Sequence, residues 1–309
     1  MVNPETITIF GGTGFIGRHL VRRLAKTGAT IRIATRDAEK ALLLKPMGDV
    51  GQIVPVACSV RSDASVAKAI GNADIVINLI GILFEKGGNT FEALHVETAA
   101  RIARLAKEAG AKKLIHMSAL GASENASAKY ARSKYAGEKA VRTFFPDATI
   151  FRPSIVFGPE DHFFNRFASL ARFAPALPLI GGGTTKFQPV YVGDVAEATA
   201  RALTHTNAAG KTFELGGPQI YTFRELLELM LEQTGRKRCL INLPWGLAKL
   251  QAAFLELAPK PPLTCDQVEM LKTDNVVASG AKASTDLGIN PTALEVILPT
   301  YLDRFRKAQ

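Results

Sequence analysis

The sequence predicts an α/β protein with a doubly wound parallel sheet and a smaller, mainly helical lobe toward the C-terminus. Short apolar segments alternate with segments of helical periodicity through about the first half of the 309 residues, which is the order that a parallel sheet requires. A glycine-rich loop at residues 11–17 joins the first apolar segment to the first helical one. A chain of this length can bury one large core or two unequal ones.

We expect six strands in the first half of the chain, each followed by a turn or a helix. They span residues 6–10, 30–35, 53–57, 74–78, 113–118 and 149–152. Among the helices between them are residues 92–109 and 130–144, which carry apolar side chains at helical spacing. Beyond the sixth strand, Pro175, Pro178 and the glycines at 181–183 predict loops, and residues 188–192 predict a further strand.

The loop at residues 11–17 has the composition of a dinucleotide-binding turn. Gly11 permits a sharp turn, Gly14 lets backbone N–H groups approach a pyrophosphate, and Gly17 lets the helix pack close to the sheet. A helix N-terminus also favours an anion. A tight strand–helix turn without a ligand is the weaker alternative. The residues expected to line the site here are Gly11, Thr13, Gly14, Phe15, Ile16, Gly17 and Arg18.

Three segments in the second half have the spacing of a capping box, in which the first residue caps a helix. These pairs are Asp194 with Glu197, Thr222 with Glu225, and Thr264 with Gln267. Most of the chain after Gly217 is expected to be helical. We therefore expect a dinucleotide-binding unit of residues 1–160 and 187–216, and a C-terminal lobe of residues 161–186 and 217–309.

The residue after the second strand selects between NAD and NADPH. An acidic side chain there would bind the ribose 2′-hydroxyl of NAD, whereas this chain has Arg36, whose guanidinium suits a 2′-phosphate. Arg18 is placed to reach the same phosphate. Asp37 follows directly, and a shift of one position would restore an acid. On the charge argument the sequence favours NADPH.

Tyr130 and Lys134 are one helical turn apart and share a helix face. In a reductase with this arrangement, the ammonium lowers the pKa of the phenol and binds the nicotinamide ribose, and the phenol exchanges a proton with the substrate. The alternative is a solvated helix pair without a ligand. Their position after the fifth strand of a dinucleotide fold favours a role in the site.

With these residues in place, the chain resembles the short-chain dehydrogenase/reductase superfamily, in its extended and atypical branches, which have a Rossmann sheet. The turn at residues 78–81, Ser118 and residues 152–154 also match. The resemblance implies further cofactor contacts from Ser59, Val60, Leu79, Ile80, Gly81, Ser118, Pro153 and Ser154, beside Tyr130 and Lys134.

The catalytic serine or threonine of that superfamily falls on Ala119 in this chain. Alanine has no hydroxyl to bind a substrate carbonyl, so the resemblance implies an incomplete catalytic set and no independent catalysis. If Ser118 takes that role instead, then Ser118, Tyr130 and Lys134 form a complete set. The sequence leaves this offset of one residue open.

A closer resemblance covers nearly the whole chain. It is to the NADPH-binding Rossmann accessory subunits of respiratory complex I, and residues 46–52, 76–81, 107–110, 130–139, 157–161, 188–192, 262–269 and 273–274 carry it. It implies a tightly held, structural NADPH and other complex I subunits as partners. Ser59 departs from the pattern, because that family has an acid near the adenine. An NADP-dependent reductase or epimerase and a redox sensor that reports to a partner are the alternatives.

Composition bears on location. The net charge is +10, and Cys58, Cys239 and Cys265 are far apart and lack metal-ligand spacing, which is typical of a reducing compartment. The first strand begins almost at once, leaving no room for a transit peptide. No nucleic-acid-binding motif is present. We expect a bacterial homologue, peripheral on the cytoplasmic side of the inner membrane.

One segment between Pro244 and Pro259 suggests how a membrane would be reached. Leu247, Leu250, Phe254 and Leu257 fall on one helical stripe. A core helix of the small lobe is the favoured interpretation. The other is a face that meets lipid headgroups or the membrane arm of the complex.

Overall fold

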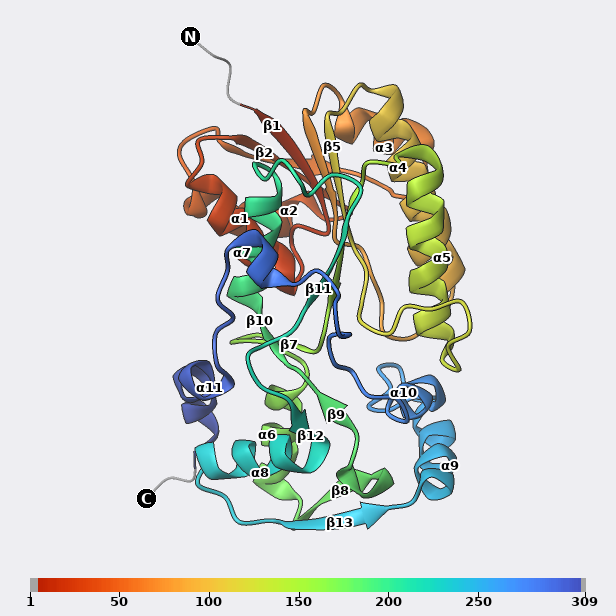
Figure 1. Ribbon diagram of the computed structural model, residues 1–309, viewed down its shortest axis with the longest axis vertical. Helices are drawn as coiled ribbons and strands as arrows, with labels where there is room; N and C mark the ends of the chain where they lie inside the picture. Colours follow the sequence, from red (N-terminus) through yellow and green to blue (C-terminus); the bar gives the residue numbers. More distant parts are fainter. Residues whose placement is uncertain (1–4, 307–309) are drawn as a thin grey trace.

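A seven-stranded, wholly parallel sheet forms the upper part of the molecule in Figure 1, in the order β11-β6-β5-β4-β1-β2-β3. The computed structural model describes residues 5–306. The strands are β1 (Thr6–Phe10), β2 (Thr30–Thr35), β3 (Ile53–Ala57), β4 (Ile75–Asn78), β5 (Lys113–Met117), β6 (Thr149–Pro153) and β11 (Thr212–Leu215). The six predicted strands are confirmed to within one residue at each end, and β11 completes the sheet. The doubly wound fold class is confirmed.

Helices cover both faces of this sheet, making three layers. One face carries α1 (Phe15–Ala25) and α7 (Val192–Ala202), and the other carries α3 (Asp63–Ile70), α4 (Thr98–Glu108) and α5 (Lys129–Phe144). Between β2 and β3 lie α2 (Ala38–Ala41) and the 3₁₀ segment η1 (Leu42–Met47). The predicted helix at 92–109 is divided, because a π-helical turn, η2 (Glu92–Glu97), precedes α4.

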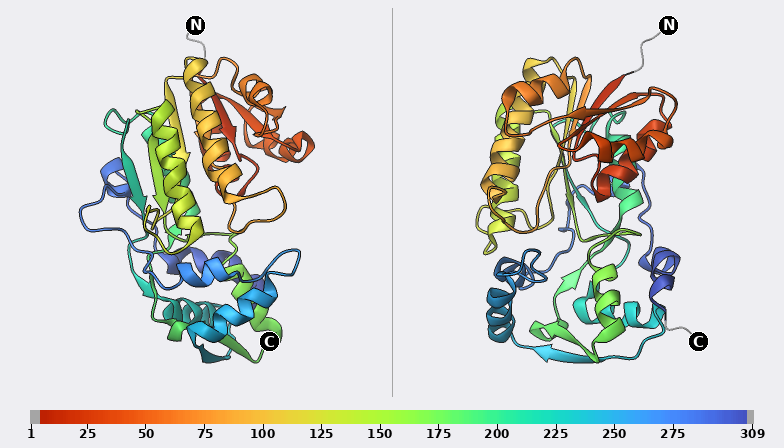
Figure 2. Two further views of the ribbon diagram at one scale, coloured as in Figure 1. Left: turned by 90° about the vertical axis from the view of Figure 1, so that its right-hand side faces the viewer. Right: turned by 180° about the vertical axis from the view of Figure 1, so that it is seen from behind.

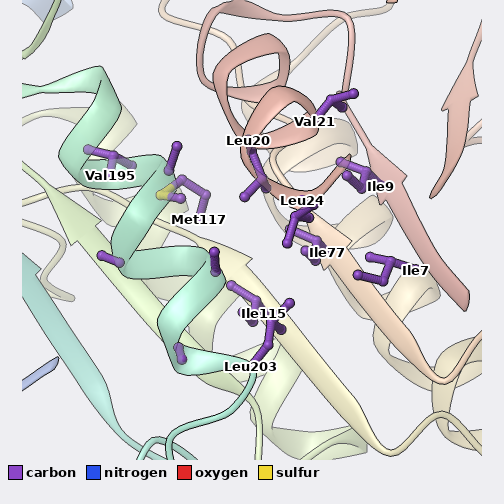
Figure 3. Close-up of a cluster of buried hydrophobic side chains, with 14 of the residues drawn as sticks. Ile7, Ile9, Leu20, Val21, Leu24, Ile77, Ile115, Met117, Val195 and Leu203 are labelled. Atoms are coloured by element: carbon purple, nitrogen blue, oxygen red, sulfur yellow. The ribbon is translucent and has the colours of Figure 1, made fainter. Parts of the chain in front are cut away.

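Branched side chains fill the space between the sheet and α1 and α7. Figure 3 shows Ile7, Ile9, Ile77, Ile115 and Met117 from the strands facing Leu20 and Leu24 of α1 and Val195 of α7. All eight are buried. Their alternation along each strand leaves every second residue for the opposite face, where α3, α4 and α5 pack.

The C-terminal lobe lies below the sheet in Figure 1 and has its own core, in which Phe157, Phe164, Phe187 and Phe223 are buried. Its helices are α6 (Phe164–Phe173), α8 (Phe223–Gln233), α9 (Trp245–Leu255), α10 (Cys265–Met270) and α11 (Leu294–Leu302). Short paired strands join the two parts or lie in the lobe: β7 (Val156–Phe157) with β10 (Val190–Tyr191), β8 (Ala176–Ile180) with β13 (Cys239–Leu243), and β9 (Lys186–Phe187) with β12 (Tyr221–Thr222). The 3₁₀ turns are η3 (Gly181–Gly183), η4 (Ser284–Leu287) and η5 (Asp303–Phe305).

Two of the three predicted helix caps are confirmed. Thr222 accepts a hydrogen bond from the Glu225 N–H at 3.2 Å, and Thr264 accepts one from the Gln267 N–H at 3.2 Å. The prediction for Asp194 is wrong, because α7 begins two residues earlier, at the buried Val192 that follows β10 directly. The Asp194 carboxylate instead accepts hydrogen bonds from Thr292.

The predictions of loops and strands beyond β6 are partly wrong. Pro178 lies inside β8, where an edge position tolerates a residue without an N–H group. The strand expected at 188–192 is reduced to the two residues of β10. The lobe is mainly helical, as predicted.

We propose the division of the chain into residues 1–160 with 187–216 and residues 161–186 with 217–309. The segment around η4 crosses back to the sheet, because Leu287 and Ile289 belong to the core beneath α1 and α7. The Glu214 N–H in β11 also donates to the Lys282 carbonyl. The C-terminal segment is thus tied to both parts of the molecule.

The apolar stripe on α9 and at its C-terminal end is exposed rather than buried in the core of the lobe. Leu247, Leu250, Phe254 and Leu257 are 57% to 85% exposed, and only Ala248 and Ala252 of this helix are buried. The interpretation of the stripe as a core face is therefore wrong for these four side chains. Within residues 5–306, no helix is both long and apolar enough to cross a membrane.

Candidate dinucleotide-binding site

The glycine-rich loop lies at the carboxyl end of β1, next to β4, where the strand order reverses. This position is where open parallel sheets form a crevice for ligands. Gly11 has a φ of +82°, and the Gly14 N–H donates to the Gly11 carbonyl at 3.0 Å. A Cβ atom on Gly17 would lie 2.4 Å from the Gly11 carbonyl oxygen. Only glycine therefore lets α1 approach the turn this closely.

The first turn of α1 is open to an anion. Gly14 is the N-cap residue, no side chain caps the helix, and no acidic residue lies in its first turn. The backbone N–H groups of such a turn have no partner within the helix. Thr13, Phe15 and Ile16 are half-buried at this point. Arg18 turns toward Glu160, with its Nη1 atom 3.8 Å from the carboxylate.

At the end of β2 the structure separates Arg36 from Asp37. The strand ends at Thr35, and Arg36 follows it with an exposed side chain. The Asp37 carboxylate accepts a hydrogen bond from the Lys40 N–H at 3.0 Å and so caps α2. One oxygen of the acid that would favour a ribose 2′-hydroxyl thus accepts a hydrogen bond from the backbone of α2.

The ends of β3 and β4 carry four further residues that the sequence predicts for the site: Ser59, Val60, Leu79 and Ile80. Ser59 is exposed and Val60 half-buried after β3, and the Val60 carbonyl accepts a hydrogen bond from Arg101 at 3.0 Å. Leu79 continues beside β1, because its N–H donates to the Phe10 carbonyl at 2.9 Å. Its backbone also lies against Gly11. The Ile80 N–H donates to the Asn78 side chain at 3.0 Å, which fixes the turn.

Tyr130 and Lys134 lie buried on α5, and Lys134 lies against Gly81 in the turn after β4. The Lys134 Nζ atom donates to the Met117 carbonyl at 3.1 Å and lies 5.9 Å from the centroid of the Tyr130 ring. A Cβ atom on Gly81 would be 3.1 Å from Nζ. The structure thus brings together residues from the ends of β4 and β5 and from α5.

Burial shifts both of these groups toward their neutral forms. Desolvation lowers the pKa of Lys134 to about 8, although the nearby Glu138 carboxylate opposes the shift. Desolvation also raises the pKa of the Tyr130 phenol. A dry environment therefore disfavours the phenolate that proton transfer to or from a substrate would require.

Ser118 is hydrogen-bonded to Glu138, which forms an ion pair with Arg152 that the sequence did not predict. Its hydroxyl donates to the Glu138 carboxylate, which also receives two hydrogen bonds from Arg152, at 2.9 and 2.7 Å. Glu138 is 5% exposed, and the Arg152 guanidinium holds it in place. Ser118 thus satisfies a buried carboxylate, whereas Ala119 beside it is half-buried. In the sequence, the only sign that Glu138 faces the same side of α5 as Lys134 is their spacing of one helical turn.

Two buried histidines beneath the site were also missed. The Ile82 N–H donates to His95 Nε2 at 3.0 Å, so the proton of this neutral ring is on Nδ1, which lies 2.8 Å from the Ser133 hydroxyl. His116 Nδ1 lies 3.2 Å from the Asn78 amide nitrogen. Burial, with a smaller effect of the Lys134 charge, lowers the pKa of each histidine to about 3.

The end of β6 joins the lobe to the site. The Pro153 carbonyl accepts a hydrogen bond from the Leu120 N–H at 2.9 Å. The Ser154 hydroxyl lies 2.7 Å from the side-chain oxygen of Asn275. Pro153 therefore extends the pairing of β5 and β6, while Ser154 holds the segment that returns from the C-terminal lobe. Among residues 5–306, no group of three or more His, Cys, Asp or Glu side chains is placed to hold a metal ion.

The structure places a strand, a glycine loop and a helix at the point of strand reversal, near a buried Tyr–Lys pair. A comparison of the sequence with known families points to the same kind of domain. The model of the NAD dependent epimerase/dehydratase family matches residues 7–216. The chain belongs to this family.

Several relatives that match nearly the whole chain are subunits of complex I. The chain is 39% identical to NADH dehydrogenase [ubiquinone] 1 alpha subcomplex subunit 9 of Arabidopsis thaliana, over 99% of this chain and 79% of that protein. The rat protein of the same name is 40% identical, over 99% and 81%. Ceramide reductase of Caulobacter vibrioides is 31% identical, over 77% and 73%.

Solved structures with this fold include an NADP(H) complex. The triphenylmethane reductase of Citrobacter sp. with NADP(H) has a TM-score of 0.76 and 20% identity, covering 96% of this chain and 99% of that one. At this identity the likeness concerns the fold alone. It extends to the C-terminal lobe, because nearly all of both chains is covered.

The two buried histidines predict how stability depends on pH. In the unfolded chain they take up protons near pH 6.5, whereas in the folded chain each stays neutral until about pH 3. Their contribution is complete above pH 6.5 and is lost progressively as the pH falls toward 3. Each adds a slope of up to about 1.4 kcal/mol per pH unit to the free energy of unfolding.

Urea titrations at a series of pH values below about 7 measure this slope. His116→Gln keeps a hydrogen-bonding side chain but takes up no proton, so its slope should be shallower than that of the unmodified chain. His162→Gln, at an exposed histidine, is the matched control. Equal slopes for His116→Gln and the unmodified chain would contradict the assignment of a neutral buried His116.

Proposed function

We propose that this chain is an accessory subunit of respiratory complex I that binds NADPH as a structural ligand and supports assembly or stability without turning it over. We place it in a bacterium, peripheral on the cytoplasmic side of the inner membrane. The observation that carries the proposal is the similarity to complex I subunits over 99% of the chain, through both the sheet and the lobe.

The polar groups at the carboxyl edge of the sheet support NADPH as the ligand. The pyrophosphate would rest on Gly11, Gly14 and Gly17, and the exposed guanidinium of Arg36 would take the 2′-phosphate. Asp37 caps α2 through one carboxylate oxygen, whereas Arg36 directly after β2 offers a positive charge. Arg18 lies beside Glu160 in the first turn of α1, where it would adjust toward a phosphate.

The inner end of the site favours binding over chemistry. Tyr130 and Lys134 would hold the nicotinamide ribose, but burial shifts both groups toward their neutral forms. Ala119 supplies no hydroxyl, and the hydroxyl of Ser118 is engaged by Glu138. A ligand held without turnover stabilises the folded chain in proportion to the logarithm of its concentration over Kd.

The exposed face of α9 supports a peripheral position, with the C-terminal lobe toward the membrane or a neighbouring subunit. Four large apolar side chains, Leu247, Leu250, Phe254 and Leu257, are exposed on this helix and its C-terminal end. Such a cluster is typical of an interaction surface. The net charge of +10 would favour an anionic membrane surface.

A reductase or epimerase with NADP is the second candidate. It is favoured by the intact Tyr130–Lys134 pair and by the relationship to the Caulobacter ceramide reductase. The two candidates differ in whether a substrate oxidises bound NADPH, and in whether the chain is found with complex I.

Removing the positive charge of Arg36 tests the cofactor assignment. Arg36→Ala should weaken NADPH binding about tenfold or more, because a charge-assisted hydrogen bond to the 2′-phosphate is lost, and should leave NADH binding unchanged. Isothermal titration calorimetry with both ligands gives the two Kd values. Lys26→Ala removes an equal charge at the far end of α1 and should change neither. Equal affinities of the unmodified chain for NADH and NADPH would sink the assignment.

The absence of turnover is tested by following NADPH absorbance. We expect no steady-state oxidation with carbonyl substrates, including long-chain ketones, or with sugar nucleotides, because Ala119 has no hydroxyl to orient a substrate carbonyl and Glu138 engages the hydroxyl of Ser118. Tyr130→Phe should then leave association with the complex intact. A substrate-dependent oxidation that Tyr130→Phe abolishes would establish the reductase candidate instead.

Gentle solubilisation of membranes, followed by identification of co-migrating proteins, tests the location. The unmodified chain should co-migrate with complex I subunits. Leu250→Asp with Phe254→Asp should release it while the melting temperature stays near normal, since both side chains are exposed. Leu43→Asp with Val50→Asp adds the same charges at exposed sites on the sheet domain and should not release it. An unmodified chain found only free of respiratory subunits would refute the subunit assignment.

A further inference from the structure

The helix that carries Tyr130 and Lys134 is capped by a residue from the C-terminal lobe. The residue before α5, Ala128, offers no capping side chain. Instead the Asp266 carboxylate of α10 accepts hydrogen bonds from the Lys129 N–H at 2.6 Å and from the Tyr130 N–H at 2.9 Å. The two partners are more than one hundred residues away in the sequence.

A cap at this position acts on Tyr130 more than on the rest of the helix. The first N–H groups of a helix lack partners within it, and a carboxylate there satisfies them and interacts favourably with the helix dipole. Tyr130 is the second residue of α5, so its backbone lies in the turn that frays first. Lys134 lies a full turn further along, within the regular part of the helix.

The same part of the lobe also contacts the loop that follows Gly81. The Pro259 carbonyl accepts a hydrogen bond from Lys86, in the loop that follows Gly81. Glu256, at the end of α9, accepts the Cys265 N–H at 2.6 Å at the start of α10. A continuous segment from α9 to α10 therefore contacts both the loop after β4 and the first turn of α5.

We infer that Asp266 is a positioning residue of the dinucleotide site, and that through it the nicotinamide end of the site and the α9–α10 segment are coupled. The inference rests on the proposed function and adds a regulation to it. Coupling of two sites is reciprocal, so a ligand that orders Tyr130 strengthens the seating of α10, and seating of α10 strengthens the hold on that ligand. A partner bound to the exposed face of α9 would then sense whether NADPH is present.

Two ligands separate this role from a general structural one. NADPH reaches Tyr130 with its nicotinamide half, whereas 2′,5′-ADP carries only the adenosine half, which lies at the ends of β1 to β3. Asp266→Ala should weaken NADPH binding about fivefold to tenfold, which is the stability that a lost helix cap typically costs converted to a ratio of Kd values, and leave 2′,5′-ADP binding within about twofold. Calorimetry gives both Kd values on the full-length chain.

Two further variants make the comparison specific. Asp266→Asn keeps one of the two accepting oxygens and should be intermediate between the unmodified chain and Asp266→Ala. Glu269→Gln lies on the same helix, but its carboxylate pairs with Lys249 and Lys272, so it should bind both ligands as the unmodified chain does.

Hydrogen exchange gives a readout in the lobe itself. In the unmodified chain, NADPH should slow amide exchange in residues 245–270 more than 2′,5′-ADP does. In Asp266→Ala the two ligands should have the same effect on this segment, because the contact that transmits the difference is gone.

The outcomes distinguish this inference from the proposed function. NADPH affinity that is the same in Asp266→Ala and in the unmodified chain overturns the inference alone. Equal weakening of both ligands also overturns it, since that result indicates general damage to the fold. An unmodified chain that binds neither ligand overturns the proposed function and this inference with it.

Discussion

The close approach of α1 to the turn after β1 is the constraint on which the site depends. Gly17 has no side chain, so the helix N-terminus reaches the backbone of Gly11, which itself lies against Leu79 at the end of β4. The N-terminus of α1, the turn after β1 and the end of β4 therefore lie together where the strand order reverses. The buried branched side chains under α1 and α7 keep this geometry rigid, because a close-packed core leaves no room for the helix to shift.

Several polar side chains are buried next to the site. The Glu138–Arg152 pair, His95 and His116 all lie between the sheet and α4 or α5. Glu138 and His95 have specific partners on neighbouring elements, whereas His116 is bonded through Nδ1 alone and its buried Nε2 has no hydrogen-bond partner. The same dryness shifts Lys134 and Tyr130 toward their neutral forms.

The sequence was sufficient wherever local rules decide the structure. The six strands, the glycine loop and the caps at Thr222 and Thr264 follow from alternation and spacing within a few residues. It was insufficient where distant residues decide. Asp194 has the local spacing of a cap but binds Thr292 instead, and Ala128 precedes a helix that Asp266 caps from the lobe. The roles of Ser118 and His95 likewise depend on partners from other elements.

The C-terminal lobe joins these observations. In a family whose sheet domain binds a dinucleotide, the lobe over the carboxyl edge is where a substrate would be received. Here the Asp266 carboxylate of α10 accepts hydrogen bonds from the first turn of α5. The segment after α9 contacts the loop beyond Gly81. Four large apolar side chains on α9 and at its C-terminal end are exposed to solvent. The lobe thus contacts the first turn of α5 and the loop after β4 on one side and leaves the apolar face of α9 exposed on the other, which is compatible with the accessory-subunit role of its relatives.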